Sequence, residues 1–209
     1  MLIRPPGFRG AAFTTAAAGD MLSGDREEVS GTLGIRAEWA SLRQIHGADV
    51  VTATGPGRAG PADALVTGAR DLPLAVMTAD CVGVVLETED AVGVAHAGWR
   101  GVVAGVVAAT ARRLEGLGRR SGPVLRAATG PLIGPCCFEV GPEVAGLFHD
   151  RHVKSTGGMT TVDLATAVRD QVPQAEWWSL EACTRCEDGW FSFRADGSEH
   201  RLAALGWIP

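Results

Sequence analysis

Two histidines and one cysteine lie in short polar segments that interrupt apolar stretches of this sequence. The segments are residues 44–47 (QIHG), 78–81 (TADC) and 96–101 (HAGWRG). Polar side chains at the ends of buried strands must find partners, so we expect His46, Cys81 and His96 to act together. Two imidazoles and one thiolate suit zinc, and catalytic zinc commonly keeps three protein ligands and one open position. The three residues are therefore predicted to form a catalytic metal site, with zinc preferred and copper possible.

Three charged residues within or directly beside these segments are candidates for substrate binding. Asp80 directly precedes Cys81 and could accept a hydrogen bond from a metal-binding histidine. Arg100 could hold an anion such as phosphate through two parallel hydrogen bonds, and Arg43 is a candidate second arginine for the same anion. The alternatives are that Asp80 caps a turn and that Arg100 forms a structural ion pair.

The other four cysteines form an adjacent pair and a C-x-x-C pair. They are Cys136 with Cys137 and Cys183 with Cys186. Together they could in principle form a structural zinc site, but side chains of adjacent residues diverge on a strand. We therefore expect a rigid loop at the adjacent pair, no second zinc site, and a C-x-x-C pair that is dispensable for chemistry.

Size and composition indicate a globular, single-domain protein spanning residues 1–209. The chain has 209 residues, 46% hydrophobic residues and a net charge of −5. No basic stripe suggests nucleic-acid binding, and no apolar run reaches the ~20 residues that span a membrane. The absence of a recognisable signal peptide and the odd number of cysteines, five, favour a cytoplasmic protein. A monomer is expected.

The pattern of apolar residues indicates an α+β fold with mixed β-sheets packed between helices. Strands are expected within residues 39–53, with a turn at His46 and Gly47, on both sides of residues 78–81, and within 91–101. The clearest helix covers 102–118, is closed by Gly118, and has an apolar face that includes Val103. Helices are also expected at 26–35, capped by Asp25, and at 162–172, capped by Asp163. The tail, residues 190–208, predicts a hairpin.

At these segments the sequence resembles the laccase-domain proteins, also called multicopper polyphenol oxidoreductases and described as multifunctional purine nucleoside phosphorylases. The matching strings are QIHGADV, ADALVT, MTADCVGVVL, VGVAHAGWRGVVAGVV, GPLIGPCCFEVGPEV, VDL and CTRCEDGWFSFRADG. The resemblance implies two mixed sheets packed between helices and a metal, usually zinc, bound by His46, Cys81 and His96. It also implies phosphorolysis of adenosine, inosine and methylthioadenosine, adenosine deamination, and therefore nucleoside and phosphate as partners. The segment FTTAAAGDMLSG departs from the glycine-rich segment that the family usually carries.

Three other functions remain open at this point. A copper-dependent polyphenol oxidase would need a multinuclear cluster with many imidazoles, whereas the chain has five histidines and His149, His152 and His200 are expected to be exposed. A metal-free cysteine hydrolase would use Cys81 as nucleophile and His96 or His46 as base. A structural zinc module would normally have four protein ligands. Deamination would need Asp80 or a histidine as proton carrier, because the usual zinc-deaminase motifs are absent.

Overall fold

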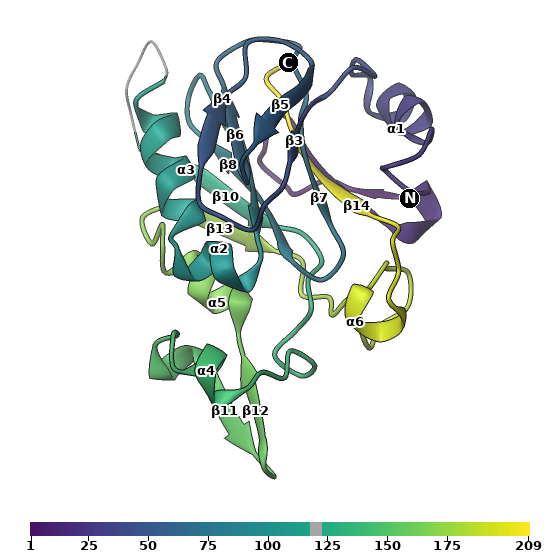
Figure 1. The fold of residues 1–209 in the computed structure, drawn as a ribbon. Coiled ribbons are helices and arrows are strands. Elements are labelled where there is room, and N and C mark those ends of the chain that lie inside the picture. Colours follow the sequence, from purple (N-terminus) through teal and green to yellow (C-terminus); the bar gives the residue numbers. More distant parts are fainter. Residues whose placement is uncertain (118–122) are drawn as a thin grey trace.

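Two six-stranded sheets lie face to face in the structure, a computed structural model that describes residues 1–117 and 123–209 (Figure 1). The first sheet has the order β1-β2-β14-β7-β3-β5, with strands Leu2–Ile3, Ala11–Thr14, Leu202–Gly206, Leu74–Thr78, Ala40–Arg43 and Gly57–Pro61. The second has the order β13-β10-β8-β9-β6-β4, with strands Glu176–Ser179, Arg126–Thr129, Val82–Glu87, Val92–Ala97, Ala64–Thr67 and Val50–Thr52. A separate ribbon pairs β11 (Val153–Thr156) with β12 (Met159–Val162).

Both large sheets are mixed. In the first sheet β3 runs parallel to β5 and β7, while β14 is antiparallel to β2 and β7. In the second sheet β8 and β9 are antiparallel, while β4 runs parallel to β6 and β10 to β13. The expectation of an α+β fold with mixed sheets in one compact domain is therefore confirmed.

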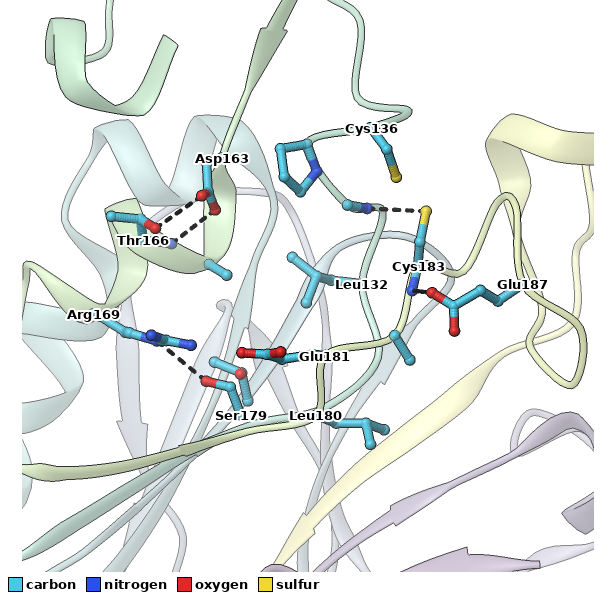
Figure 2. Close-up of a pocket in the computed structure, with 15 residues that line it drawn as sticks. Leu132, Cys136, Asp163, Thr166, Arg169, Ser179, Leu180, Glu181, Cys183 and Glu187 are labelled. Atoms are coloured by element: carbon cyan, nitrogen blue, oxygen red, sulfur yellow. Dashed lines mark hydrogen bonds between the residues drawn. The ribbon is translucent and has the colours of Figure 1, made fainter. Parts of the chain in front are cut away.

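The helices flank the sheets and mostly follow the sequence pattern. They are α1 (Arg26–Leu33), α2 (Trp99–Val103), α3 (Val106–Glu115), α4 (Pro142–Ala145), α5 (Leu164–Arg169) and α6 (Phe193–Asp196), with short 3-10 turns at Ala16–Ala18 and Asp150–His152. Asp163 caps α5 as predicted, because its carboxylate accepts the backbone N–H of Thr166 at 3.0 Å (Figure 2). The Asp25 carboxylate instead accepts the N–H of Asp20 and does not cap α1.

The helix predicted over 102–118 is interrupted near its start. Gly105 adopts a left-handed φ of 80°, which separates α2 from α3 and leaves Val103 43% exposed. Gly118, the predicted end of this helix, lies outside the described residues. The change of direction at Gly105 therefore takes Val103 off the apolar face that the periodicity predicted.

Two further expectations, for the tail and for one histidine, are wrong. Residues 193–196 form the helix α6, because the Ser192 side chain accepts the N–H of Ala195, and β14 then pairs with β2 and β7 instead of closing a hairpin. His152 is buried, because the 3-10 turn packs it against α5 and its ring hydrogen-bonds with the Asp170 carboxylate. His149 and His200 are exposed as expected.

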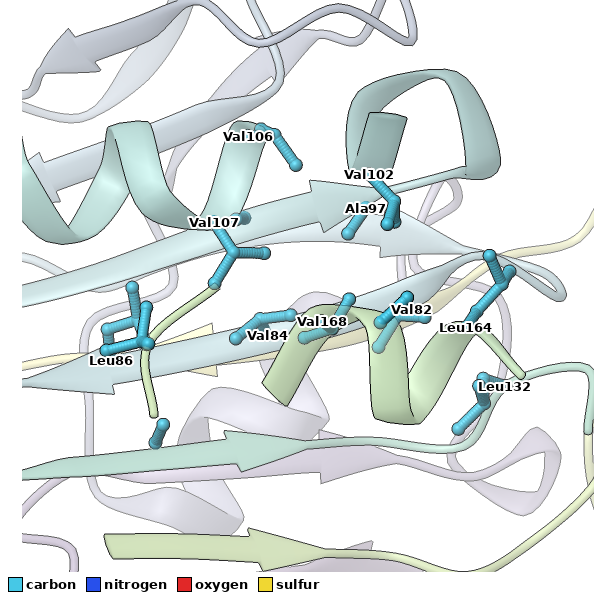
Figure 3. Packing of buried hydrophobic residues seen from close by; sticks show 14 of the residues in the cluster. Val82, Val84, Leu86, Ala97, Val102, Val106, Val107, Leu132, Leu164 and Val168 are labelled. Atoms are coloured by element: carbon cyan, nitrogen blue, oxygen red, sulfur yellow. The ribbon is translucent and has the colours of Figure 1, made fainter. Parts of the chain in front are cut away.

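Apolar side chains fill both sides of each sheet, so the central strands β7, β8, β9 and β14 are buried along their whole length. One cluster lies between the sheets, a second packs α2, α3 and α5 on the second sheet (Figure 3), and a third packs α1 on the first sheet. Strands buried on both faces can present polar side chains to solvent only near their ends. Within residues 1–117 and 123–209, we find no helix with the length and apolar character required to cross a membrane.

The chain passes from one sheet to the other at two of the three polar segments. Residues 44–47 join β3 of the first sheet to β4 of the second, and residues 79–81 join β7 to β8 in the same direction. The third segment follows β9 at the start of α2. Two of the three polar segments therefore lie at connections between the two layers.

Gly83 allows a close approach of the two sheets beside this region. A Cβ atom on Gly83, in β8, would lie 2.7 Å from the Cβ of Ala204 in β14. We predict that Gly83→Ala lowers the free energy of unfolding by about 1–3 kcal/mol through overpacking. Gly31→Ala is the control, since an added Cβ there meets nothing within 4 Å and should stabilise α1 by up to about 1 kcal/mol. Urea denaturation measures both, and unchanged stability of Gly83→Ala would contradict the proposed contact.

Candidate functional site

His46, Cys81 and His96 come together where the three polar segments meet. Their ligand atoms all lie within 4.8 Å of one another. The rings of His46 and His96 are 4.8 Å apart between centroids and inclined by 79°, so they meet edge to face. His96 is buried near the end of β9, Cys81 is half-buried and His46 is exposed, so the group extends from the core to the surface.

The Asp63 carboxylate, which is fully buried, holds two of these residues in place. It accepts a hydrogen bond from His96 Nδ1 at 2.8 Å and the backbone N–H groups of Ile45, His46 and Gly47 at 3.2, 2.9 and 2.7 Å. With Nδ1 bound to Asp63, the other ring nitrogen of His96 is left for a ligand. The three backbone contacts stabilise the left-handed conformation of His46, which has a φ of 60°.

Two further contacts shape the same corner of the molecule. The Gln44 side chain bridges to β7 by donating to the carbonyl of Met77 at 2.7 Å and accepting its N–H at 2.8 Å. A Cβ on Gly98 would lie only 3.0 Å from Cys81 Sγ and 3.0 Å from His46 Cδ2. The close approach of backbone to the site therefore favours glycine at position 98.

Asp80 does not hold a histidine, contrary to the expectation from its position. Its carboxylate accepts the hydroxyl groups of Thr184 and Ser192, each at 2.6 Å, and the backbone N–H of Arg194 at 2.7 Å. Asp63 takes the role of histidine acceptor, because it directly precedes β6, which pairs with β9 and so brings its carboxylate to His96 Nδ1. The available sequence signal was an aspartate within the apolar string ADALVT.

The same contacts change the pKa values of the metal-free site. Burial opposes ionisation of Cys81, but hydrogen bonds with His46 and His96 outweigh it and lower the pKa of the thiol from 9.0 to about 6. Burial likewise opposes protonation of His96, but Asp63 and Cys81 raise its pKa from 6.5 to about 9. Burial would raise the pKa of Asp63, yet His96 and the N–H of Gly47 lower it. A thiolate and an imidazolium therefore coexist between roughly pH 6 and 9.

The three residues line a cavity of about 510 Å³, a size typical of small-molecule sites. Arg100 lies on the cavity wall with its guanidinium 4.3 Å from the centroid of the Trp99 ring. Asp80 also lines the cavity, whereas Arg43 is exposed on β3 and is not among the lining residues. Three arginines that sequence reasoning did not single out share the wall with Arg100: Arg58, Arg194 and Arg201.

Comparisons with known proteins agree on one family. A family model described as "Multi-copper polyphenol oxidoreductase laccase" matches residues 13–209. "Purine nucleoside phosphorylase SCO2081" of Streptomyces coelicolor is 34% identical over 202 residues, covering 90% of this chain and 82% of that protein. "Purine nucleoside phosphorylase" of Deinococcus radiodurans is 36% identical over 195 residues, covering 88% and 76%. The crystal structure of YlmD from Geobacillus stearothermophilus has a TM-score of 0.85 at 28% identity, covering 100% of this chain and 96% of that chain.

The depressed pKa of Cys81 predicts how metal-free protein reacts with a thiol reagent. Alkylation at Cys81, followed by peptide mass mapping, should rise with a midpoint near pH 6, because the thiolate is the reactive form. Asp63→Asn should move this midpoint upward, since loss of the carboxylate lowers the pKa of His96 and removes the positive charge that favours the thiolate. Asp49→Asn, an exposed carboxylate nearby, is the control and should leave it unchanged. An ordinary midpoint near pH 9 in the unmutated protein would contradict the thiolate–imidazolium pair.

Proposed function

Because the chain belongs to the multi-copper polyphenol oxidoreductase laccase family, we propose that it is a zinc-dependent purine nucleoside phosphorylase that also deaminates adenosine. Relatives that are 34% and 36% identical carry the name purine nucleoside phosphorylase. The observation that carries the proposal is the convergence of His46, Cys81 and His96 in an arginine-lined cavity. The proposed substrates are adenosine, inosine and methylthioadenosine, with phosphate as the second substrate.

The chemistry and spacing of the three donors suit one zinc ion. Two imidazole nitrogens and one thiolate with low pKa lie within 4.8 Å of one another, and three protein ligands are the usual set in catalytic zinc sites. Asp63 orients His96 as carboxylates commonly orient metal-binding histidines. When bound, zinc would supply a Lewis acid and a water of lowered pKa.

Positive charge in the cavity favours phosphate. Four guanidinium groups line it, those of Arg58, Arg100, Arg194 and Arg201, whereas Asp80 is the one lining carboxylate among the described residues. Asp80 already accepts three hydrogen bonds from neutral protein groups. An arginine fork matches two phosphate oxygens, so these groups can orient phosphate for attack on the sugar carbon that carries the purine.

Aromatic rings on the same wall offer faces for the base. Trp99 and Phe193 line the cavity, and Phe193 is 62% exposed. Stacking between such rings and a heterocycle is insensitive to the identity of the base. The combination of flat apolar faces and arginines therefore fits a nucleoside beside an anion, and accommodates several purines.

Deamination needs a proton carrier near the attacked carbon, and Asp80 is the one lining carboxylate among the described residues that could serve. Its carboxylate accepts hydrogen bonds from two hydroxyl groups and one N–H, which position the turn before Cys81. His46 also lies at the cavity wall, but as a proposed zinc ligand its metal-binding nitrogen is not available to carry a proton. Proton transfer through Asp80 would be an instance of general acid–base catalysis.

A metal-free cysteine hydrolase is the second candidate function, because Cys81 and His96 form a thiolate–imidazolium pair.

Copper-dependent phenol oxidation is disfavoured by the distribution of the five histidines. His149 and His200 are exposed and His152 is engaged with Asp170, which leaves two imidazoles at the site, whereas a multinuclear copper cluster needs many. Treatment with a strong chelator separates a cysteine hydrolase from a zinc enzyme. The cysteine hydrolase would keep its activity, whereas the zinc enzyme would lose activity and regain it only after zinc is returned.

Arg100→Lys should raise the apparent KM for phosphate, by about 10-fold or more, because a lysine offers a point charge in place of a fork. Zinc content should not change, and deamination, which uses water, should suffer less than phosphorolysis. Arg43→Lys is the matched control, since Arg43 lies outside the cavity lining and its replacement should leave the KM unaltered. Chromatography of released purine, with and without phosphate, provides the measurement. Equal loss of both activities in folded, zinc-loaded Arg100→Lys would refute the phosphate role.

Cys81→Ser should remove one zinc ion per chain, because a hydroxyl is a poor zinc ligand compared with a thiolate. Elemental analysis of the purified variant measures the loss, and phosphorolysis should fall with it. Full retention of zinc in Cys81→Ser would count decisively against the ligand assignment.

A further inference from the structure

The four cysteines outside the cavity form a second cluster of sulfur atoms. The Sγ atoms of Cys136, Cys137, Cys183 and Cys186 all lie within 4.8 Å of one another. Cys137 and Cys183 are buried, while Cys136 and Cys186 are exposed. Among residues 1–117 and 123–209 the cluster consists of cysteines alone, so its donor set differs from that of the site at Cys81.

Two turns make this arrangement possible. Residues 134–138 form a tight turn in which the carbonyl of Gly134 accepts the N–H groups of Cys137 and Phe138, both at 2.9 Å. Because the adjacent pair lies in a turn and not in a strand, its side chains reach the same space, contrary to our expectation from the sequence. A second turn follows Cys183, whose carbonyl accepts the N–H of Glu187 at 3.1 Å.

Backbone pairing brings the two turns together. Leu132 and Cys183 form a parallel β-bridge, and the N–H of Thr184 donates to the carbonyl of Leu132 at 2.9 Å. The N–H of Gly134 donates to Cys183 Sγ at 3.2 Å, and Figure 2 shows this contact with Cys136 beside it. The sulfur atoms are thus placed by the backbone of both segments.

The spacing matches a tetrahedral thiolate site. Zinc–sulfur bonds of about 2.3 Å place the sulfur atoms roughly 3.8 Å apart, and Cys136 Sγ lies 3.7 Å from Cys186 Sγ. A disulfide would join only two of the four sulfur atoms and would require about 2.05 Å between them. We propose that Cys136, Cys137, Cys183 and Cys186 bind a second zinc ion in a closed, structural tetrathiolate site.

The second zinc ion would stabilise one wall of the cavity. Ile133 and Phe138, on the first cysteine-bearing segment, line the cavity, and the N–H of Ile133 donates to the carbonyl of Asp80 at 2.8 Å. Thr184, between the two cysteines of the other segment, binds the Asp80 carboxylate. A metal that clamps both segments would therefore fix Asp80 and, through it, the turn that carries Cys81.

Zinc counting on the full chain tests this proposal. Protein purified without added metal should contain two zinc ions per chain, Cys81→Ser should contain one, and Cys136→Ser with Cys186→Ser should contain one. The triple variant should contain none. One zinc ion in the unmutated protein and none in Cys81→Ser would overturn the second site, and this result would leave the first site intact.

Two further measurements keep the test decisive if the double variant fails to fold. Cobalt(II) added to zinc-depleted Cys81→Ser should produce the intense sulfur-to-metal absorption of a tetrathiolate complex, which the site at Cys81 cannot form. Four thiols of Cys81→Ser should resist a thiol reagent until chelator is added. Absence of the cobalt spectrum, or a mass under non-reducing conditions that reveals a disulfide between Cys136 and Cys186, would contradict the proposal.

Discussion

The geometry of the candidate active site depends on one buried carboxylate, that of Asp63. It accepts three consecutive backbone N–H groups from residues 45–47 and one ring N–H from His96. These donors lie beside the core, where an unpaired N–H would be costly. The Asp63 carboxylate therefore satisfies the N–H groups of a turn that contains the left-handed residue His46. It also fixes the orientation of the His96 imidazole. Since the turn carries His46, the same interaction sets the position of both histidines relative to Cys81.

The layered fold explains why the reactive residues gather at one place. Central strands buried on both faces leave only their ends for polar side chains, and two of these ends are also crossings between the sheets. Gly98 and Gly83 permit close approach of backbone and sheets beside the crossings. Tight packing and the functional site thus favour glycine in the same region, and the packed scaffold holds together residues that are far apart in the sequence.

Asp80 connects this site to the four-cysteine cluster. It precedes Cys81, and its carboxylate is held by Thr184, which lies within the C-x-x-C segment, and by two groups near the start of α6. The cavity wall is thereby assembled from the turn before β8, the segment around Ile133 and the segment after β13. A change that loosens the cysteine cluster would act on the cavity through this carboxylate, without contact with a substrate.

The amino-acid sequence by itself determined the α+β class, the buried strands, the cap of α5 at Asp163 and the three residues whose donor atoms converge, because these follow from local periodicity, capping chemistry and residue type. It did not reveal Asp63 as the acceptor for His96, the arginines at positions 58, 194 and 201, or the approach of the adjacent cysteine pair to the C-x-x-C pair. Each of these depends on contacts between segments far apart in the sequence, such as Asp63 and His96, which are separated by 33 positions, and Cys136 and Cys186, which are separated by 50. Only the tertiary structure decided them, since pairing between distant segments is set by sheet order and packing and leaves no periodic signal in the chain.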